Sequence, residues 1–294
     1  MSHAYLVGLI GSGIGTSSTP ALHEREADAL GIRYLYRTID IDELGVAPEG
    51  AAELVAAARR LGYDALNVTH PCKQTVWEAL DDLSADARLL GAVNTILFRD
   101  GRAIGHNTDH SGFAAGLRTG LDDPDLDDVV LLGSGGAGSA IAYALLRAGT
   151  RRLSVFDPVV TRAAAVRDAL GAAFPDARIT PIGTDQVADA VAASDGLVNA
   201  TPVGMVGHPG TPIDPALLHE RLWVADAIYR PLHTELLDAA SALGCAVLDG
   251  GRMVASQAAD TFRLITGVEP DRDRMRAHFL ELSGAAGVAT SAAQ

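Results

Sequence analysis

Polar side chains follow directly on an apolar stretch in residues 65–74, ALNVTHPCKQ. The first half of this segment is typical of a buried strand, and Thr69 and Lys73 come where that strand would end. Because open α/β sheets bind ligands beyond the carboxyl ends of their strands, both side chains could face a bound molecule. Taken alone, a single lysine is better explained by a solvated helix face.

Four other polar side chains lie near expected strand ends or domain junctions. The hydroxyls of Ser17 and Thr19, in SSTP, could hold a carboxylate, although Thr19 could instead cap a helix that begins at Pro20. Asn94, in GAVNT, could bind a ligand or hold a loop backbone. Asp109, in GHNTD, could act near the junction of two domains or cap a helix whose pattern begins at about Ser111.

Glycines in residues 129–149, VVLLGSGGAGSAIAYALLRAG, predict a phosphate-binding loop. Gly133, Gly135 and Gly138 have the G-x-G-x-x-G spacing, after a strand pattern and before a helical one. Such glycines allow a tight turn, a close approach of the backbone to a pyrophosphate, and close helix packing. The N–H groups of the helix N-terminus then face the anion. The alternative is a glycine-rich turn that binds no ligand.

An acidic residue, Asp157, ends the next strand pattern at about the spacing, roughly 20 residues, seen in dinucleotide-binding folds. A carboxylate there can accept hydrogen bonds from the adenosine ribose and repels a 2′-phosphate. Pro158 and Val159 follow, so no cation is adjacent, although Arg162 lies nearby in the sequence. The pattern favours NAD over NADP. Asp157 could alternatively cap the following helix.

The elements that must position these residues alternate between strand and helix patterns. Strand patterns in residues 5–12, 33–41 and 65–70 are separated by helical ones, and Asp100 and Gly101 form the turn of a hairpin. A second alternating series starts near Asp127. We therefore expect an α/β protein with two domains and a cleft between them: a substrate domain with a mostly parallel sheet, and a Rossmann-type dinucleotide-binding domain.

The expected domain boundaries follow from the same patterns. Residues 1–107 should form the substrate and catalytic domain, completed by C-terminal helices in 251–286, because the helix after DGGRM has no following strand. Residues 108–250 should form the NAD-binding domain, and residues 287–294 a disordered tail.

Composition limits the classes of partner. The chain has 294 residues and a formal net charge of −14, which disfavours nucleic acid and anionic membranes. No apolar run is long enough to span a bilayer, and the N-terminus does not resemble a signal peptide. Cys72 and Cys245 form neither a disulfide framework nor a metal-binding spacing, so we expect no metal and a cytoplasmic location.

Together these stretches resemble the shikimate dehydrogenase family over nearly the whole chain. The family's carboxylate-binding Ser-x-Ser/Thr-Pro pattern corresponds to residues 17–20, and its glycine loop to GSGGAG. Other matching motifs occur in the family's order: NVTHPCK, GAVNT, GHNTD, NATPVGM, DAIYRPLHTELL and GGRMVASQAADTF.

The resemblance implies reversible hydride transfer between a nicotinamide and C3 of a hydroxylated cyclohexane or cyclohexene carboxylate. It makes Lys73 and Asp109 the catalytic pair, with Lys73 either exchanging the hydroxyl proton or stabilising alkoxide charge as a hydrogen-bond donor. The implied substrate-binding residues are Ser17, Thr19, Thr69, Lys73, Asn94, Asp109 and Gln257. The expected cofactor-binding residues are Gly133, Ser134, Gly135, Gly136, Ala137, Gly138, Asp157, Arg162, Ala227, Tyr229 and Gly250.

Three departures resemble the NAD-dependent quinate/shikimate dehydrogenase subgroup. Asp157 stands where biosynthetic members have an arginine-containing Asn-Arg-Thr stretch, Thr19 replaces a second serine, and Arg252 replaces a glycine. We expect NAD as cofactor and shikimate, quinate or both as substrate, in aromatic amino acid biosynthesis or quinate catabolism. A homodimer is compatible with the family. The alternatives are a dehydrogenase of an aminoshikimate analogue and a non-catalytic dinucleotide sensor; the presence of both Lys73 and Asp109 argues against the sensor.

Overall fold

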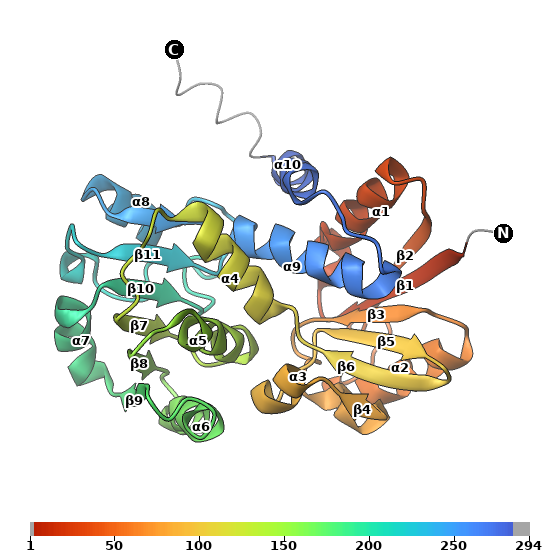
Figure 1. The fold of residues 1–294 in the computed structure, drawn as a ribbon, viewed down its shortest axis with the longest axis horizontal. Helices are drawn as coiled ribbons and strands as arrows, with labels where there is room; N and C mark the ends of the chain where they lie inside the picture. The colour runs from red at the N-terminus through yellow and green to blue at the C-terminus, as the bar shows by residue number, and fades with distance from the viewer. Residues whose placement is uncertain (1–2, 285–294) are drawn as a thin grey trace, which may run out of the picture. The chain divides into compact units, whose positions relative to one another are not determined.

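The computed structural model describes residues 3–284, and the chain divides into two compact units (Figure 1). The first contains the described residues up to Thr108 together with those from Gln257 onward, and the second runs from Asp109 to Ser256. Each unit is built on a six-stranded sheet, as the alternating patterns predict for an α/β fold. The tail predicted for residues 287–294 lies outside the described residues.

The sheet of the first unit combines parallel strands with one hairpin. β1 pairs in parallel with β2 and β3, β5 pairs antiparallel with β3 and β6, and β4 pairs in parallel with β6. The predicted hairpin is confirmed: Asp100 and Gly101 both have positive φ, 49° and 74°, between β5 and β6. In sheet order the strands are β2 (Arg33–Asp40), β1 (Ala4–Gly11), β3 (Ala65–Val68), β5 (Thr95–Arg99), β6 (Arg102–His106) and β4 (Asp82–Leu83).

Helices cover this sheet because its strands are apolar on both faces. Val7 and Leu9 of β1 pack in a cluster that includes Phe262 and Ile265 of α9, while Ile10 packs in another that includes Val55 of α2. The helices of this unit, with the shared α9, are α1 (Thr19–Ala29), α2 (Ala51–Arg60), α3 (Ala85–Leu90), α9 (Gly250–Thr266) and α10 (Arg272–Leu282). Short 3-10 helices are η1 (Ile14–Thr16), η2 (Pro48–Gly50) and η3 (Thr75–Ala79).

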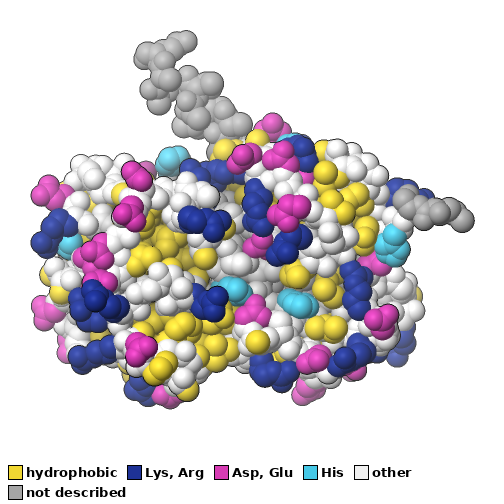
Figure 2. Space-filling view, in the orientation of Figure 1, with side chains coloured by type: hydrophobic (Ala, Val, Ile, Leu, Met, Phe, Trp, Pro, Cys, Tyr) yellow, Lys and Arg dark blue, Asp and Glu magenta, His cyan; other side chains and the backbone are white. Residues whose placement is uncertain are grey.

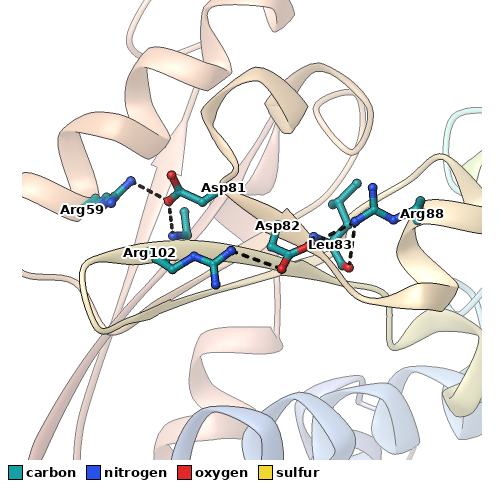
Figure 3. Close-up of polar contacts among 7 residues, drawn as sticks. Arg59, Asp81, Asp82, Leu83, Arg88 and Arg102 are labelled. Carbon is teal, nitrogen blue, oxygen red and sulfur yellow. Dashed lines mark hydrogen bonds and ion pairs between the residues drawn. The ribbon is translucent and has the colours of Figure 1, made fainter.

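The short edge strand β4 is held by a network of charged side chains (Figure 3). Asp81 accepts a hydrogen bond from Arg59 at 2.9 Å and another from a backbone N–H of β6 at 2.7 Å. Asp82 accepts from Arg88 at 3.1 Å and from Arg102 at 3.2 Å. Backbone N–H donors and these arginines hold the pKa of both carboxyls below the usual range. Strand patterns do not predict β4, because it has only two residues and one of them is charged.

All strands of the second sheet are parallel, and their order is that of a doubly wound fold. β7 is central: β8 and β9 extend to one side of it, and β10, β11 and β12 to the other. The order therefore reverses between β7 and β10, the place where such sheets bind ligands. The predicted Rossmann-type topology is confirmed. The strands are β7 (Asp128–Leu132), β8 (Arg152–Phe156), β9 (Arg178–Ile182), β10 (Gly196–Asn199), β11 (Trp223–Asp226) and β12 (Ala246–Leu248).

Sequence patterns do not reveal β9, which contains Pro181. Proline lacks an N–H, and this edge position tolerates it because only one neighbour pairs with the strand. The helices of this unit are α4 (Asp109–Gly120), α5 (Gly136–Ala148), α6 (Val160–Gly171), α7 (Val187–Ala193) and α8 (Glu235–Ala242).

The surface is mixed in charge. On the face shown in Figure 2, Lys and Arg side chains are interspersed with Asp and Glu side chains. Among residues 3–284, none of the helices combines the length and hydropathy that a membrane span requires.

Candidate functional site

The loop after β1 carries the two hydroxyls predicted to hold a carboxylate. It passes through η1 and enters α1, which begins at Thr19 with Pro20 in its first turn. Ser17 Oγ accepts the Thr19 N–H at 3.3 Å, and both side chains are half-buried. The alternative in which Thr19 caps the helix is wrong, because Ser18 is the N-cap residue and no side chain makes a capping hydrogen bond at the start of α1.

The loop after β3 carries Thr69 and Lys73. The Thr69 N–H donates to the Ile10 carbonyl at 2.9 Å, so the loop continues alongside the end of β1. The Lys73 carbonyl accepts the Val93 N–H at 2.9 Å, which fixes the backbone that carries the amine. Lys73 is half-buried and lies in the turn before η3. The alternative prediction, that Lys73 lies on a solvated helix face, is therefore wrong.

These two loops contact one another at Gly11. A Cβ at this position would lie 2.4 Å from Thr69 Cγ2 and 3.0 Å from the His70 carbonyl oxygen, so a larger residue would force the loops apart. The Ser12 N–H also donates to the His70 carbonyl at 3.0 Å. The structure therefore places the loop of Ser17 and Thr19 beside the loop of Thr69 and Lys73, at the carboxyl ends of adjacent strands.

A buried network of polar side chains joins Asn94 to Gln257. Asn94 Nδ2 donates to Thr108 Oγ1 at 2.9 Å, while its Oδ1 accepts the Thr108 N–H at 2.9 Å and the Thr95 hydroxyl at 3.0 Å. The Thr261 hydroxyl lies 3.2 Å from that of Thr95 and 2.9 Å from that of Thr108. Thr108 Oγ1 also lies 3.4 Å from Gln257 Oε1. Two amides predicted from the sequence thus belong to one network.

The three threonines of this network are the part that sequence reasoning missed. Each of them stands in a motif that resembles the family, Thr95 in GAVNT, Thr108 in GHNTD and Thr261 in GGRMVASQAADTF, so motif position was the available signal. The interpretation of Asn94 as a residue that holds a loop backbone is confirmed by its bond from the Thr108 N–H. Asp109 follows directly, is 6% exposed and is the first residue of α4, two residues earlier than the helical pattern indicates.

In the glycine loop of the second unit, close contacts require glycine at two of the three motif positions. Gly133 has φ of 91°, and a Cβ there would lie 2.9 Å from the Ala200 carbonyl. A Cβ at Gly138 would lie 2.1 Å from the Gly133 oxygen. Gly135 differs, because its φ is −68° and no atom lies within 4 Å of an added Cβ. Neither conformation nor internal packing requires glycine at 135, which fits a close approach by a bound pyrophosphate.

Asp157 holds this loop from the neighbouring strand. Its Oδ2 accepts the N–H and the hydroxyl of Ser134 at 2.9 and 2.8 Å, and its Oδ1 accepts the Val159 N–H at 2.9 Å. Burial opposes ionisation, but these donors and the nearby Arg162 outweigh it and lower the pKa of the Asp157 carboxyl. The helix-cap alternative is wrong, because α6 starts after Val159 and has no side-chain cap.

Ala227, Tyr229 and Gly250 meet where β11 and β12 end. The Gly250 N–H donates to the Ile228 carbonyl at 3.2 Å. A Cβ at Gly250 would lie 2.5 Å from the Ala227 oxygen and 2.4 Å from that of Ile228, so the backbones approach as closely as glycine allows. The structure therefore places Gly250 against the backbone of Ala227 and Ile228, in the segment after β11 that also carries Tyr229.

Buried Asp226 organises that segment and was missed from the sequence. Its Oδ1 accepts Asn199 Nδ2 at 3.1 Å and the Ile228 N–H at 2.9 Å, and its Oδ2 accepts the Thr234 hydroxyl at 2.8 Å. Burial raises the pKa of Asp226 against these donors. An acid that ends a strand, in DAIY, was the available signal. Within residues 3–284, no cluster of His, Cys, Asp and Glu is arranged to hold a metal.

Comparisons with known proteins show which family the whole chain resembles. Residues 9–96 match the family described as the shikimate dehydrogenase substrate binding domain. The chain is 56% identical over 288 residues to a shikimate dehydrogenase (NADP(+)) of Pseudarthrobacter chlorophenolicus, covering 98% of each chain. It is 48% identical to a quinate/shikimate dehydrogenase (NAD(+)) of Corynebacterium efficiens, covering 96% of this chain and all of the relative.

A solved structure extends the likeness to three dimensions. The quinate dehydrogenase from Corynebacterium glutamicum, in complex with NAD, superposes with a TM-score of 0.89 at 47% identity, covering 95% of this chain and 99% of that one. Motif order, fold and identity over nearly the full length agree. The chain belongs to the shikimate dehydrogenase family.

Proposed function

We propose that this protein is an NAD-dependent dehydrogenase that interconverts shikimate with 3-dehydroshikimate, quinate with 3-dehydroquinate, or both, by hydride transfer at C3. Family membership supports the reaction type, and relatives named for shikimate and for quinate support this class of substrate. The first unit is the proposed substrate domain and the second the proposed dinucleotide domain. A cytoplasmic location and a homodimer stay predictions.

The substrate acid is proposed to bind to the loops of the first unit. Ser17 and Thr19 supply hydroxyls for its carboxylate, beside the loop that carries Thr69 and Lys73. Thr69, Asn94 and Gln257 bind the ring hydroxyls. The network around Thr261 supports this assignment, because its hydrogen bonds hold both amides in set orientations.

Lys73 and Asp109 are proposed as the proton-transfer pair. A nicotinamide dinucleotide, when bound, supplies the hydride acceptor for alcohol oxidation and the donor for the reverse reaction. The hydroxyl proton must leave as the carbonyl forms, and the Lys73 amine takes it or, in reduction, returns it. The backbone bond from Val93 to the Lys73 carbonyl holds the base of this side chain in place. Asp109, a buried carboxylate, is the proposed partner of this amine.

The preference for NAD is carried by one observation, the bonding of Asp157. Its carboxylate, at the end of β8, is bonded to Ser134 of the glycine loop, and its lowered pKa keeps it anionic at neutral pH. An anion there accepts ribose hydroxyls and repels the 2′-phosphate of NADP. The relatives are named for both cofactors, with NADP(+) at 56% and NAD(+) at 48% identity, so the proposal rests on Asp157 and not on similarity.

Kinetics with purified protein test the proposal. Shikimate and quinate are each offered with NAD and with NADP, and reduced cofactor is followed by absorbance. The proposal predicts turnover with at least one acid and a higher kcat/KM for NAD. Turnover only with NADP would contradict the cofactor assignment. Cofactor binding without turnover of either acid, at neutral and alkaline pH, would contradict the dehydrogenase and favour a sensor.

A further inference from the structure

A buried carboxylate outside the predicted site holds the loop that leads to Ser17 and Thr19. Asp40 ends β2 and is 6% exposed. Its Oδ2 accepts the Ile14 N–H at 2.8 Å, and its Oδ1 accepts the N–H groups of Gly13 and Asp42, both at 3.1 Å. Burial opposes ionisation, but these backbone donors outweigh it and lower the pKa of the Asp40 carboxyl. Asp40 is therefore a charged group whose bonds go to the turn beside it.

These bonds determine where η1 begins. The first N–H groups of any helix have no partner within the helix, and here Asp40 satisfies that of Ile14. Gly13, just before, is in the left-handed region with φ of 63°. The turn thus has a defined start, and the Ser17 N–H donates to the Ile14 carbonyl at 2.9 Å at its end. The position of the Ser17 hydroxyl follows from the anchor at Asp40.

The same strand end also relates this loop to the loop of Lys73. The Ile41 N–H donates to the Gly11 carbonyl at 2.9 Å, which joins the residue after Asp40 to the last residue of β1. Gly11 is where the loop of Ser17 contacts Thr69. A change at Asp40 should therefore alter the position of the Ser17 and Thr19 hydroxyls relative to Thr69 and Lys73.

We propose that Asp40 is a positioning residue for the substrate carboxylate: it anchors η1 so that Ser17 and Thr19 present their hydroxyls together. This inference rests on the proposed function, in which those hydroxyls bind the carboxylate. Asp40 has no contact with substrate in this role. Its effect should therefore appear selectively in ligands that have a carboxylate, and should leave the dinucleotide unaffected.

The test compares shikimate with shikimate methyl ester, which has the same ring and reacting hydroxyl but no anion. In the wild type, kcat/KM should strongly favour the acid. Asp40→Asn places an amide N–H group against the backbone N–H groups that Asp40 now accepts. The kcat/KM for the acid should therefore fall about ten- to hundredfold, mainly because KM rises, whereas kcat/KM for the ester should fall about threefold or less. The dissociation constant of NAD, measured by fluorescence titration, should not change.

Two other variants complete the experiment. Asp42→Asn is the matched control, because the exposed Asp42 side chain accepts only the Ser12 hydroxyl among the bonds of this turn. In this variant kcat/KM should still favour the acid over the ester as it does in the wild type. If Asp40→Asn does not fold, Gly13→Ala tests the same turn instead. The added Cβ would meet no atom within 4 Å, so the variant should fold, but alanine strains the left-handed backbone conformation at this position. A reduced preference for the acid supports the proposal.

Equal losses for acid and ester, or an unchanged preference in the deciding variant, overturn the role of Asp40. A wild type that turns over the acid and the ester equally well also overturns it, since no carboxylate site then exists to be positioned. A wild type inactive with both shikimate and quinate instead refutes the proposed function itself, so the two failures are distinguishable.

Discussion

Asn94 and Thr108 are joined by a reciprocal pair of hydrogen bonds: the Asn94 amide nitrogen donates to the Thr108 hydroxyl, and the Thr108 N–H donates to the amide oxygen, both at 2.9 Å. The pair determines which side of the amide carries its nitrogen. Because Thr108 immediately precedes Asp109, these two hydrogen bonds also anchor the chain just before a proposed catalytic residue. The proposed binding of ring hydroxyls by Asn94 and the placement of Asp109 therefore depend on the same pair of hydrogen bonds.

Thr261 should be important for activity although it is fully buried. Thr261→Val removes the hydroxyl that contacts both Thr95 and Thr108, and leaves buried hydroxyls with one partner fewer. We expect kcat/KM for the ring acid to fall about tenfold and the free energy of unfolding to fall by about 1–3 kcal/mol. Steady-state kinetics and urea unfolding measure both. Thr266→Val on the same helix is the control, because that hydroxyl bonds only local backbone groups.

Asp157→Ala should change the choice of cofactor. We expect kcat/KM for NAD to fall more than for NADP, shifting the ratio about tenfold or more, because ribose acceptors are lost and repulsion of the 2′-phosphate is removed. Ser134→Ala separates the support of the loop from the charge of Asp157: it removes the hydrogen bond from the Ser134 hydroxyl to Asp157 but keeps the carboxylate. That variant should weaken both cofactors alike. An unchanged NAD to NADP ratio in Asp157→Ala would show that Asp157 only supports the loop.

His23 should make stability depend on pH. It is fully buried against Tyr34, Tyr36 and Phe262, and burial lowers its pKa from 6.5 to about 3. The unfolded chain therefore binds a proton below about pH 6.5 that the folded protein does not. The free energy of unfolding should decrease as pH falls from 6.5, by roughly 3 kcal/mol at pH 4.

Urea unfolding between pH 8 and pH 4 measures this dependence. His23→Phe keeps an aromatic ring and should flatten the dependence of the unfolding free energy on pH in this window. His106→Gln is the control: burial also lowers the pKa of His106, but this histidine is less completely buried, so the variant should change the dependence less. Wild type and His23→Phe curves with the same slope would contradict the assignment.

An ion pair between a buried glutamate and a half-buried arginine should secure α10 to α1. Glu26 is fully buried and accepts two hydrogen bonds from Arg274, at 2.8 and 2.7 Å, and the Asp271 N–H at 2.8 Å. Glu26→Ala leaves the arginine and N–H without this partner and should cost about 3–5 kcal/mol. Glu281→Ala removes an exposed pair with Arg25 between the same helices and should cost less than about 1 kcal/mol. Equal losses in urea unfolding would contradict this account.

Local sequence patterns predict the groups that lie at strand ends. Lys73 lies on the loop after β3 and the glycine loop directly follows β7, so their position at the edge of a sheet can be inferred from hydrophobic periodicity and turn residues. Asp40 and Thr261 could not be inferred in this way. Their partners come from other strands and helices, at separations of up to 166 residues for Thr261 and Thr95, and only the folded register brings them together.

The proton-transfer role of Lys73 is the central claim, and the kcat of Lys73→Ala tests it most directly. With shikimate or quinate and NAD, measured against wild type at several pH values, kcat should fall about 10²- to 10⁴-fold, while the dissociation constant of NAD from fluorescence titration stays unchanged. A Lys73→Ala protein that keeps a kcat near that of wild type would contradict the claim.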